Sequence, residues 1–502
     1  MRRPLNRRAI HSAGLLMASS HAQCCVAARY SLQWHHLPVC DFEVRRSLMA
    51  GDVAGVATFH GMLLPIRCGL QLAIASEQAR LIAADARTTH ATLRLEPPRQ
   101  LRRHLSVALL RGSANANVDR LAALLMLDRQ CFSTNLYTTA LDAQSLRAIR
   151  HVLPDRSPAR HTPLHPSLTD GAAARLLASH DIVLDASGHT AGNRLGALAL
   201  RPAAVATAVL GYPGSYGGAR LVDYLTVDRV VMGPSTCARC VARAERLCLL
   251  PTTYQVSPIA RAAAGSTAPR EGARADDVRS GRGQLGAATA LMIGSFTRVV
   301  RWHPHSFELW AALLLRTGAS TALWLLADDA AERRRARAEL AAMGIFAARR
   351  MRFGGFEHDK AVHAARHGWL AACVDTTPLY GSHTTAADAL REAVPLLTLP
   401  SEAWASRVGA SVGAASGALE TAAASTRALV DASAALLAAA PEKGQASARG
   451  GGLGGALLAG GDPEAPEAES GDGAWQHHQP LARLAAWDRK AVRLEPSWSA
   501  WR

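Results

Sequence analysis

Two blocks of short apolar runs, each run followed by a helical pattern, constrain the fold of this chain more than any other feature. The first block contains apolar runs at residues 181–186 and 204–210, and the second at residues 290–296 and 322–327. Short apolar runs between turn signals are typical of buried parallel strands. Strands that alternate with helices over short connections indicate sheets covered by helices on both faces. The sequence therefore predicts an α/β fold with two such units.

Residues 379–411 contain the strongest candidate for a ligand site. We expect a loop there, then a helix from about Thr385 to Glu392, a buried strand over residues 396–399, and the start of another helix. The backbone N–H groups and the dipole at a helix start favour an anion such as phosphate. The residues placed at this helix start are His383, Thr384 and Thr385.

Asp388 lies one helical turn after this start, where its carboxylate can accept a hydrogen bond from a sugar hydroxyl. A second interpretation remains open, because Thr385 and Asp388 also have the spacing of a capping box, in which they only satisfy the helix end.

Composition argues against a nucleic-acid partner despite a net charge of +16. Of the 56 basic residues only three are Lys (Lys360, Lys443 and Lys490), and the Arg residues are scattered. Aromatic residues make up 5% of the chain, and no basic and aromatic stripe suggests base stacking. The pattern indicates a coding bias towards Arg. The absence of a run of about 18 apolar residues predicts no membrane span.

The cysteines do not form the pattern of a secreted disulfide framework, because the nine of them are an odd number spread along the chain. Cys237 and Cys240, with Cys248 nearby, have part of a zinc-site spacing, but a second ligand pair is missing. No metal site is predicted.

Changes in composition along the chain predict six segments. An Arg-rich N-terminus is compatible with an organellar transit peptide or with a ragged gene start, and both stay open. The segments are a poorly patterned region (1–57), a helical segment (58–104), a first lobe (105–256), a linker or insertion (257–287), a second lobe (288–440) and a low-complexity tail (441–502).

Several motifs in the same order resemble the catalytic region of the protein O-linked N-acetylglucosamine transferase family, which includes the SPINDLY proteins. The similarity runs from about residue 105 to 415, with a weaker echo at 58–80. The motifs are His180-Asp-Ile-Val-Leu-Asp-Ala-Ser-Gly-His-Thr-Ala-Gly-Asn-Arg194, Ala199-Leu-Arg-Pro202, Leu210-Gly-Tyr-Pro-Gly214, Val222-Asp-Tyr224, Ser382-His-Thr-Thr385 and Ala405-Ser-Arg-Val-Gly-Ala-Ser411.

This resemblance implies a GT-B fold, with two Rossmann-like lobes whose parallel sheets face a cleft. It implies transfer of N-acetylglucosamine from UDP-N-acetylglucosamine to Ser or Thr hydroxyls of proteins, with inversion and without a cofactor. The chain contains no Asp-x-Asp, the metal-holding signature of other glycosyltransferases, so a metal-independent reaction is expected. The family implies a cytoplasmic or nuclear protein. Tetratricopeptide repeats usually precede its catalytic region, and no 34-residue repeat is visible here.

The resemblance also assigns residues. It places the diphosphate on His383, Thr384 and Thr385, the ribose on Asp388, and the uridine and phosphates on a helix that carries Lys360, His363 and Arg366. Successive members of that trio are rotated by only about 60° around a helix, so they can share one face; an exposed polar face is the alternative. His151 matches a further family histidine.

Two departures from the family pattern leave the activity open. Arg298 and Arg301 replace the family's Gln and its leaving-group Lys; Arg keeps the charge but as a planar fork. The loop at residues 113–119 lacks the family's His. The alternatives are a catalytically impaired relative that binds nucleotide or partner proteins, and a fucosyltransferase of the same fold.

Overall fold

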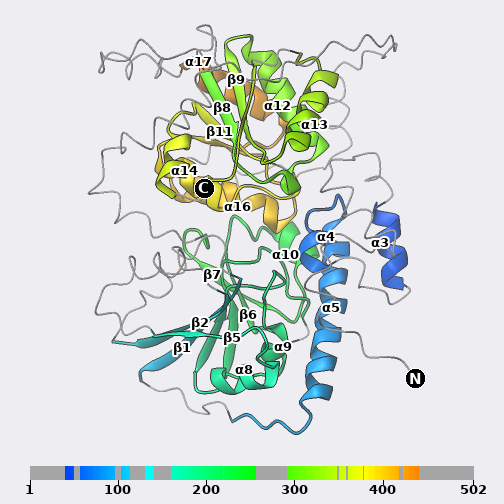
Figure 1. Ribbon diagram of the computed structural model, residues 1–502, viewed down its shortest axis with the longest axis vertical. Helices are drawn as coiled ribbons and strands as arrows, with labels where there is room; N and C mark the ends of the chain where they lie inside the picture. The colour runs from blue at the N-terminus through cyan, green and yellow to red at the C-terminus, as the bar shows by residue number, and fades with distance from the viewer. Residues whose placement is uncertain are drawn as a thin grey trace. The chain divides into compact units, whose positions relative to one another are not determined.

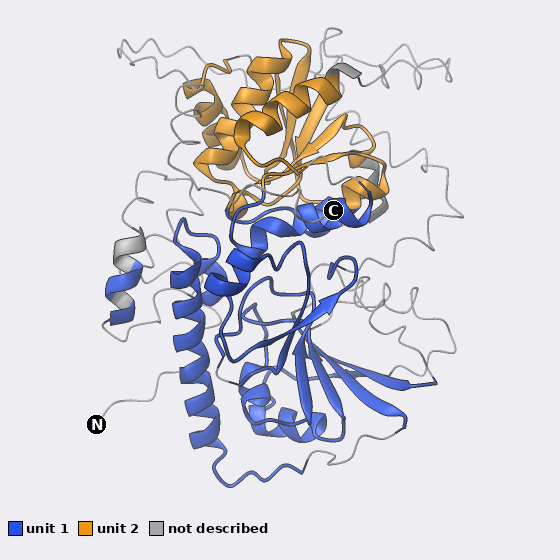
Figure 2. Cartoon of the chain, turned by 180° about the vertical axis from the view of Figure 1, so that it is seen from behind, with its two compact units in different colours: residues 1–267, 379–387, 400–419 blue, residues 268–378, 388–399, 420–502 orange. Residues whose placement is uncertain are grey.

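The structure is a computed structural model of the 502-residue chain (Figure 1). It describes residues 40–49, 57–96, 103–113, 130–140, 160–218, 220–255, 291–346, 350–357, 360–376, 378–417 and 422–439. The chain divides into two compact units (Figure 2). Unit 1 comprises residues 1–267, 379–387 and 400–419, and unit 2 comprises residues 268–378, 388–399 and 420–502.

Unit 1 is built on a seven-stranded sheet with the order β3-β2-β1-β4-β5-β6-β7, in which all paired strands are parallel. The order reverses between β1 and β4, and ligands of open α/β sheets bind at the carboxyl ends of the strands at such a switch point. The strands are β1 (Leu105–Ser113), β2 (Phe132–Ala140), β3 (Arg160–Pro163), β4 (Ile182–Asp185), β5 (Val205–Ala208), β6 (Tyr224–Asp228) and β7 (Arg246–Leu250).

The helices of unit 1 pack on this sheet and on one another. The longest, α5, lies against α9 and α10 and buries an Ala-rich stripe that includes Ala75, Ala79, Ala83 and Ala86 (Figure 1). Small side chains let helices approach closely, so this stripe suits a packed interface. The helices are α3 (Cys40–Met49), α4 (Thr58–Gly61), α5 (Cys68–Thr89), α8 (Asp170–Leu177), α9 (Leu195–Ala199), α10 (Pro234–Cys240) and α16 (Trp404–Ala415).

Helix α16 joins unit 1 although it lies more than 140 residues beyond the sheet in sequence. The Ser411 hydroxyl donates to the buried carboxylate of Asp228 at 2.6 Å. The Arg407 guanidinium donates to the carbonyl of Val230 at 2.8 Å. Asp228, which is 0% exposed, ends β6 and also accepts from the backbone N–H of Tyr254 at 2.9 Å. These bonds fix α16 at the carboxyl edge of the sheet.

A disulfide joins Cys68 at the start of α5 to Cys240 at the end of α10, with their Cα atoms 5.0 Å apart. The two residues are separated by 172 positions, and both are buried. The sequence pattern does not predict this pair. Cys240 is therefore engaged by Cys68, while Cys237 and Cys248 are exposed free thiols.

Unit 2 is built on a five-stranded parallel sheet with the order β10-β9-β8-β11-β12, which reverses between β8 and β11. Every residue of β9 is buried, as expected of a strand covered on both faces. The elements are β8 (Leu291–Ser295), the 3₁₀-helix η4 (Val299–Arg301), α12 (Pro304–Thr317), β9 (Thr321–Leu326), α13 (Ala330–Ala342), β10 (Met351–Gly354), α14 (Lys360–His367), β11 (Ala372–Val374), β12 (Leu396–Leu397) and α17 (Thr426–Ala439). Helix α15 (Thr384–Arg391) has residues in both units.

Both predicted blocks of strands and helices are present. The predicted strand at residues 396–399 is shorter in the structure, and the predicted helical segment (58–104) contains α4 and α5. The predicted linker (257–287) lies outside the described residues. Across the described parts of the chain, no helix combines the length and apolar character needed to cross a membrane.

Candidate functional site

Helix α15 begins one residue earlier than predicted, at Thr384. The N–H of Ala387 donates to the carbonyl of His383 at 3.4 Å, so His383 is the residue that caps the helix start. Thr385 is therefore the second residue inside the helix, and Thr385 and Asp388 do not have the positions of a capping box. The alternative that this pair only caps the helix is wrong. The first turn of α15 still has the N–H orientation and dipole that favour an anion.

The imidazole of His383 is held firmly just before this helix. Its Nε2 lies 2.8 Å from the carbonyl oxygen of Ala405, which also accepts from the N–H of Gly381 at 2.9 Å. A carbonyl can only accept, so Nε2 carries the proton. The ring stacks on Tyr380 with centroids 4.6 Å apart, and Tyr380 meets the edge of Phe59. These contacts fix the orientation of His383 and require a proton on Nε2.

Asp388 meets α14 in unit 2. Its carboxylate lies 3.8 Å from Nε2 of His363, and both side chains are about 15% exposed. The His363 ring rests edge-on against His367 at 4.9 Å, and His367 rests against Phe296 at 5.0 Å. The rings of His367 and Phe296 thus support the ring of His363. Its Nε2 lies beside the Asp388 carboxylate, and both side chains stay partly exposed.

Arg366 is the third predicted binding residue on α14, and its guanidinium is committed within unit 2. It is 5% exposed, donates to the carbonyl of Gly355 at 2.8 Å and lies 3.7 Å from Glu357. Lys360 begins α14, but its side chain lies outside the described residues. A shared ligand-facing surface for Lys360, His363 and Arg366 stays a prediction.

Arg298 and Arg301 follow β8 at the carboxyl edge of the unit 2 sheet. The Arg298 guanidinium lies over the ring of Phe356, 4.9 Å from its centroid. Arg301 ends η4 and is half-buried, and its N–H donates to the carbonyl of Arg298 at 2.9 Å. Both cations thus lie beside the switch point of this sheet. His151 and most of the loop at residues 113–119 lie outside the described residues.

Glycosyl transferase family 41 is the family whose model matches this chain, over residues 43–261 and 259–442. The chain belongs to glycosyl transferase family 41. The resemblance drawn from the sequence motifs is therefore confirmed, and the chain is a glycosyltransferase by family.

Named relatives agree with this assignment. The chain is 28% identical over 244 residues to the probable UDP-N-acetylglucosamine–peptide N-acetylglucosaminyltransferase SEC of Arabidopsis thaliana, and 28% identical over 238 residues to SPINDLY of the same plant. These matches cover 47% and 46% of this chain but only 23% of either relative.

A solved structure titled as a mutant O-GlcNAc transferase of Thermobaculum terrenum is also similar, with 21% identity and a TM-score of 0.63. The match covers 83% of this chain and 75% of that one. Together with the two parallel sheets, it confirms the predicted GT-B type fold.

The family 41 chain also has a buried polar group in unit 1 that the sequence interpretation passed over. Asp185 ends β4 at the switch point and is 1% exposed. Its carboxylate accepts from the Tyr216 hydroxyl at 2.7 Å and from the N–H of Gly188 at 2.8 Å. Burial raises the pKa of Asp185, although these bonds and the nearby Arg111 oppose the shift. The sequence signal that could have identified Asp185 is an acidic residue at the end of an otherwise apolar strand.

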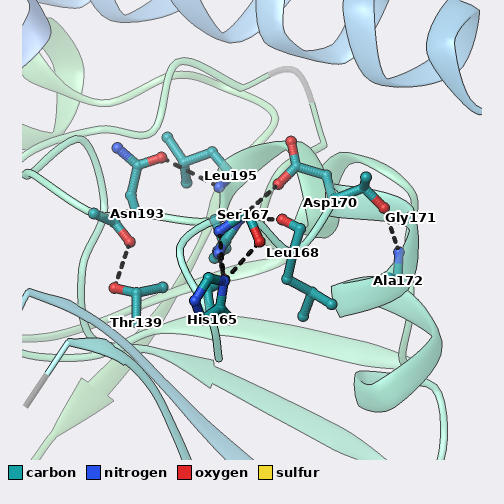
Figure 3. A network of polar contacts seen from close by, with 12 residues as sticks. Thr139, His165, Ser167, Leu168, Asp170, Gly171, Ala172, Asn193 and Leu195 are labelled. Carbon is teal, nitrogen blue, oxygen red and sulfur yellow. Dashed lines mark hydrogen bonds and ion pairs between the residues drawn. The ribbon is translucent and has the colours of Figure 1, made fainter. Parts of the chain in front are cut away.

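The loop after β4 is tied down by polar contacts (Figure 3). Thr139 at the end of β2 donates to the carbonyl of Gly192 at 3.0 Å. Arg194 donates to the carbonyls of Leu168 and His165, at 2.7 and 2.9 Å. These bonds join the loop to the carboxyl end of β2 and to the segment that follows β3.

His189 in this loop predicts a specific pH dependence of stability. It is 8% exposed, its Nε2 donates to the carbonyl of Tyr216 at 3.1 Å, and burial lowers its pKa to about 4. Between pH 6.5 and 4, His189 binds a proton in the unfolded chain but not in the folded chain. The free energy of unfolding therefore falls as the pH falls through this window. The full contribution is on the order of 3 kcal/mol.

We expect His189→Asn to flatten the loss of stability between pH 6.5 and 4, as measured by urea denaturation at a series of pH values. His165→Asn, at an exposed position, is the control and is expected to keep the wild-type slope. An unchanged slope in His189→Asn would show that His189 takes up its proton in the folded state.

Proposed function

We propose that this chain transfers N-acetylglucosamine from UDP-N-acetylglucosamine to Ser or Thr hydroxyls of acceptor proteins. Membership of family 41 and the similarity to the relatives SEC and SPINDLY support the donor and the acceptor class. The observation that carries the proposal is the start of α15, where a His of fixed orientation precedes a helix end suited to a diphosphate.

In the proposed complex, the backbone N–H groups at the start of α15 bind the diphosphate together with His383, Thr384 and Thr385. The Nε2–H of His383 donates to the carbonyl of Ala405, so a hydrogen bond from this ring to the diphosphate is proposed to come from Nδ1 of the protonated imidazolium. Thr384 and Thr385 add hydroxyl donors from the first turn of the helix. Such pre-oriented donors need no rearrangement when negative charge increases on the phosphate.

The nucleoside is proposed to bind beside Asp388 and His363. Asp388 accepts a hydrogen bond from a ribose hydroxyl. His363, whose Nε2 lies 3.8 Å from the Asp388 carboxylate, orients that carboxylate. Lys360 and Arg366 on α14 are proposed to contact the uridine and the phosphates. Arg366 also donates to the carbonyl of Gly355. In this proposal it therefore has two roles: it contacts the ligand and it fixes the loop that follows β10.

The proposed reaction is a single displacement with inversion. The acceptor hydroxyl oxygen forms a bond to the anomeric carbon, while the bond from that carbon to the β-phosphate oxygen breaks and UDP leaves with the electron pair. The hydroxyl proton passes to a base, and His151 keeps its sequence-based assignment as a catalytic residue. Arg298 and Arg301 offset the charge that develops on the leaving diphosphate.

A metal-independent reaction is part of the proposal, because the sequence has no Asp-x-Asp and supplies cations and helix N–H groups instead. We place the protein in the cytoplasm or nucleus, with an organelle left open by the Arg-rich N-terminus. Incubation with radiolabelled UDP-N-acetylglucosamine and a Ser-rich peptide tests the activity, and labelled peptide is the expected result. UDP binding without transfer would favour an impaired relative, and label from a fucose donor alone would assign a fucosyltransferase.

His383→Ala and Asp388→Ala are each expected to weaken UDP binding by about 10- to 100-fold, because a hydrogen bond to a charged group contributes about 1.5–3 kcal/mol. Isothermal titration calorimetry with UDP measures the change. Asp431→Ala, which removes a half-exposed carboxylate on α17, is the control and is expected to bind UDP as the wild type does. Wild-type affinity in both site variants would contradict the assignment of α15.

A further inference from the structure

The glycine-rich loop at residues 211–218 is tied to one buried carboxylate, that of Glu245. Glu245 lies just before β7 and is 7% exposed. Its Oε2 accepts from the Ser215 hydroxyl at 2.6 Å, and its Oε1 accepts from the N–H of Tyr216 at 2.7 Å. A longer contact of 3.4 Å reaches the N–H of Gly218. Three polar groups of the loop thus converge on one side chain.

This part of the loop needs such an acceptor because it has no strand partner. Gly217 and Gly218 adopt φ values of +90° and +72°, which other residues rarely adopt. A Cβ on Gly217 would lie 2.2 Å from the carbonyl oxygen of Ala75 in α5, so the backbone is in close contact with that helix. Buried N–H groups require an acceptor, and bonds to an ionised carboxylate are among the stronger ones.

Tyr216 in the same loop is held from two further directions. Its hydroxyl donates to Asp185 at the end of β4, and its carbonyl accepts from His189. The rings of Tyr216 and Tyr212 meet edge to face, with centroids 5.9 Å apart. The loop is therefore attached to the switch point of the unit 1 sheet at Asp185 and to the start of β7 at Glu245.

The other half of the loop faces a pocket in unit 1. Tyr212, Gly214 and Ser215 line this pocket together with Trp404 and Ala405 at the start of α16. The carbonyl of Ala405 is the group that holds His383. Ser215 thus belongs both to the pocket wall and to the bond with Glu245.

We infer that Glu245 is a positioning residue for the glycosyl transfer: its carboxylate holds the loop at residues 211–218 in the conformation that turnover requires. The inference rests on the proposed function. Glu245 acts through Ser215 and Tyr216 and does not touch substrate. UDP itself is assigned to α15 and to the pair formed by His363 and Asp388, so loss of Glu245 is expected to lower kcat and leave UDP affinity unchanged.

Glu245→Gln is the principal variant. In Gln an NH2 group replaces one of the two carboxylate oxygens, so with its carbonyl oxygen facing the N–H of Tyr216 it presents a donor to the Ser215 hydroxyl. The Ser215 oxygen already accepts from the N–H groups of Gly217 and Ala242, so the hydroxyl proton loses its acceptor. We expect kcat to fall about 10-fold or more, with the Kd of UDP within about twofold of wild type. Glu308→Gln is the matched control: Glu308 is 8% exposed and pairs with His305 in unit 2, so this variant is expected to keep the wild-type kcat.

Ser215→Ala supplies a second variant in case loss of the carboxylate impairs folding. It is expected to lower kcat in the same direction, and the double variant Glu245→Gln/Ser215→Ala is expected to lose less than the product of the two single losses. Fully multiplicative losses, or a wild-type kcat in Glu245→Gln, would overturn the inference.

Hydrogen exchange separates this inference from the proposed function, because it needs no activity. The N–H groups of residues 216–218 are expected to exchange at least 10-fold faster in Glu245→Gln than in the wild type, and to be unchanged in Glu308→Gln. Unchanged exchange would refute the anchoring role even in an active enzyme. Faster exchange in Glu245→Gln, in a protein whose wild type transfers no sugar, would refute the proposed function. It would still support the role of Glu245 in holding the loop at residues 211–218.

Discussion

Cys68→Ser is expected to lower the free energy of unfolding of unit 1 by about 5 kcal/mol. The disulfide with Cys240 closes a loop with a sequence separation of 172, and loop-closure entropy in the unfolded chain grows with loop length. Both cysteines are buried, Cys68 at the start of α5 and Cys240 at the end of α10. Urea denaturation of the oxidised proteins measures the difference.

Cys237→Ser is the matched control, because Cys237 lies on the same short helix as Cys240 but is an exposed free thiol. It is expected to unfold at the wild-type urea concentration. A reducing agent is expected to bring the wild type to the stability of Cys68→Ser and to leave that variant unchanged. Alkylation of both Cys68 and Cys240 in the non-reduced wild type would rule out the disulfide.

Arg301→Ala is expected to lower kcat for sugar transfer by about 10²- to 10³-fold, the range found when a charge-stabilising donor is removed from an active site. Arg301 ends η4 beside the switch point of the unit 2 sheet, and the sequence resemblance places it where the family has its leaving-group Lys. Arg301→Lys restores a compact cation and is expected to preserve or raise kcat. Steady-state assays with radiolabelled donor measure both variants.

Arg316→Ala controls for the loss of a positive charge, because Arg316 is 61% exposed near the end of α12. It is expected to keep the wild-type kcat. A wild-type kcat in Arg301→Ala would remove this residue from the mechanism. A lower kcat in Arg301→Lys would show that the site has adapted to the planar guanidinium.

The apolar interior strands were predictable from sequence, whereas the edge strand β7 and the polar interior strand β2 were not. β4, β5, β8 and β9 are short apolar runs, because parallel strands covered on both faces need apolar side chains on both. The edge strand β7 contains the apolar run Leu247–Leu250, yet its residues are exposed or half-buried, and no strand was predicted there. The polar, Thr-rich strand β2 was missed because its sequence does not distinguish it from a loop.

The start of α15 was predicted to within one residue, but the contacts that orient its side chains were not. The bond from His383 to Ala405 spans 22 positions, and the bond from Ser411 to Asp228 spans 183. Spacing within one helix contains no information about such pairs. The assignment of residues 379–387 and 400–419 to unit 1 depends on these contacts, which is why the sequence suggested two contiguous lobes instead.

Thermal unfolding in the presence of UDP tests the central claim, that this family 41 chain binds a uridine diphosphate through the start of α15. At UDP concentrations about 100-fold above the Kd, the bound state is stabilised by about 2.7 kcal/mol, which raises the Tm by roughly 5–10 °C. We predict that rise for the wild type and a clearly smaller one for His383→Ala. A wild-type Tm that does not change at millimolar UDP would contradict the account.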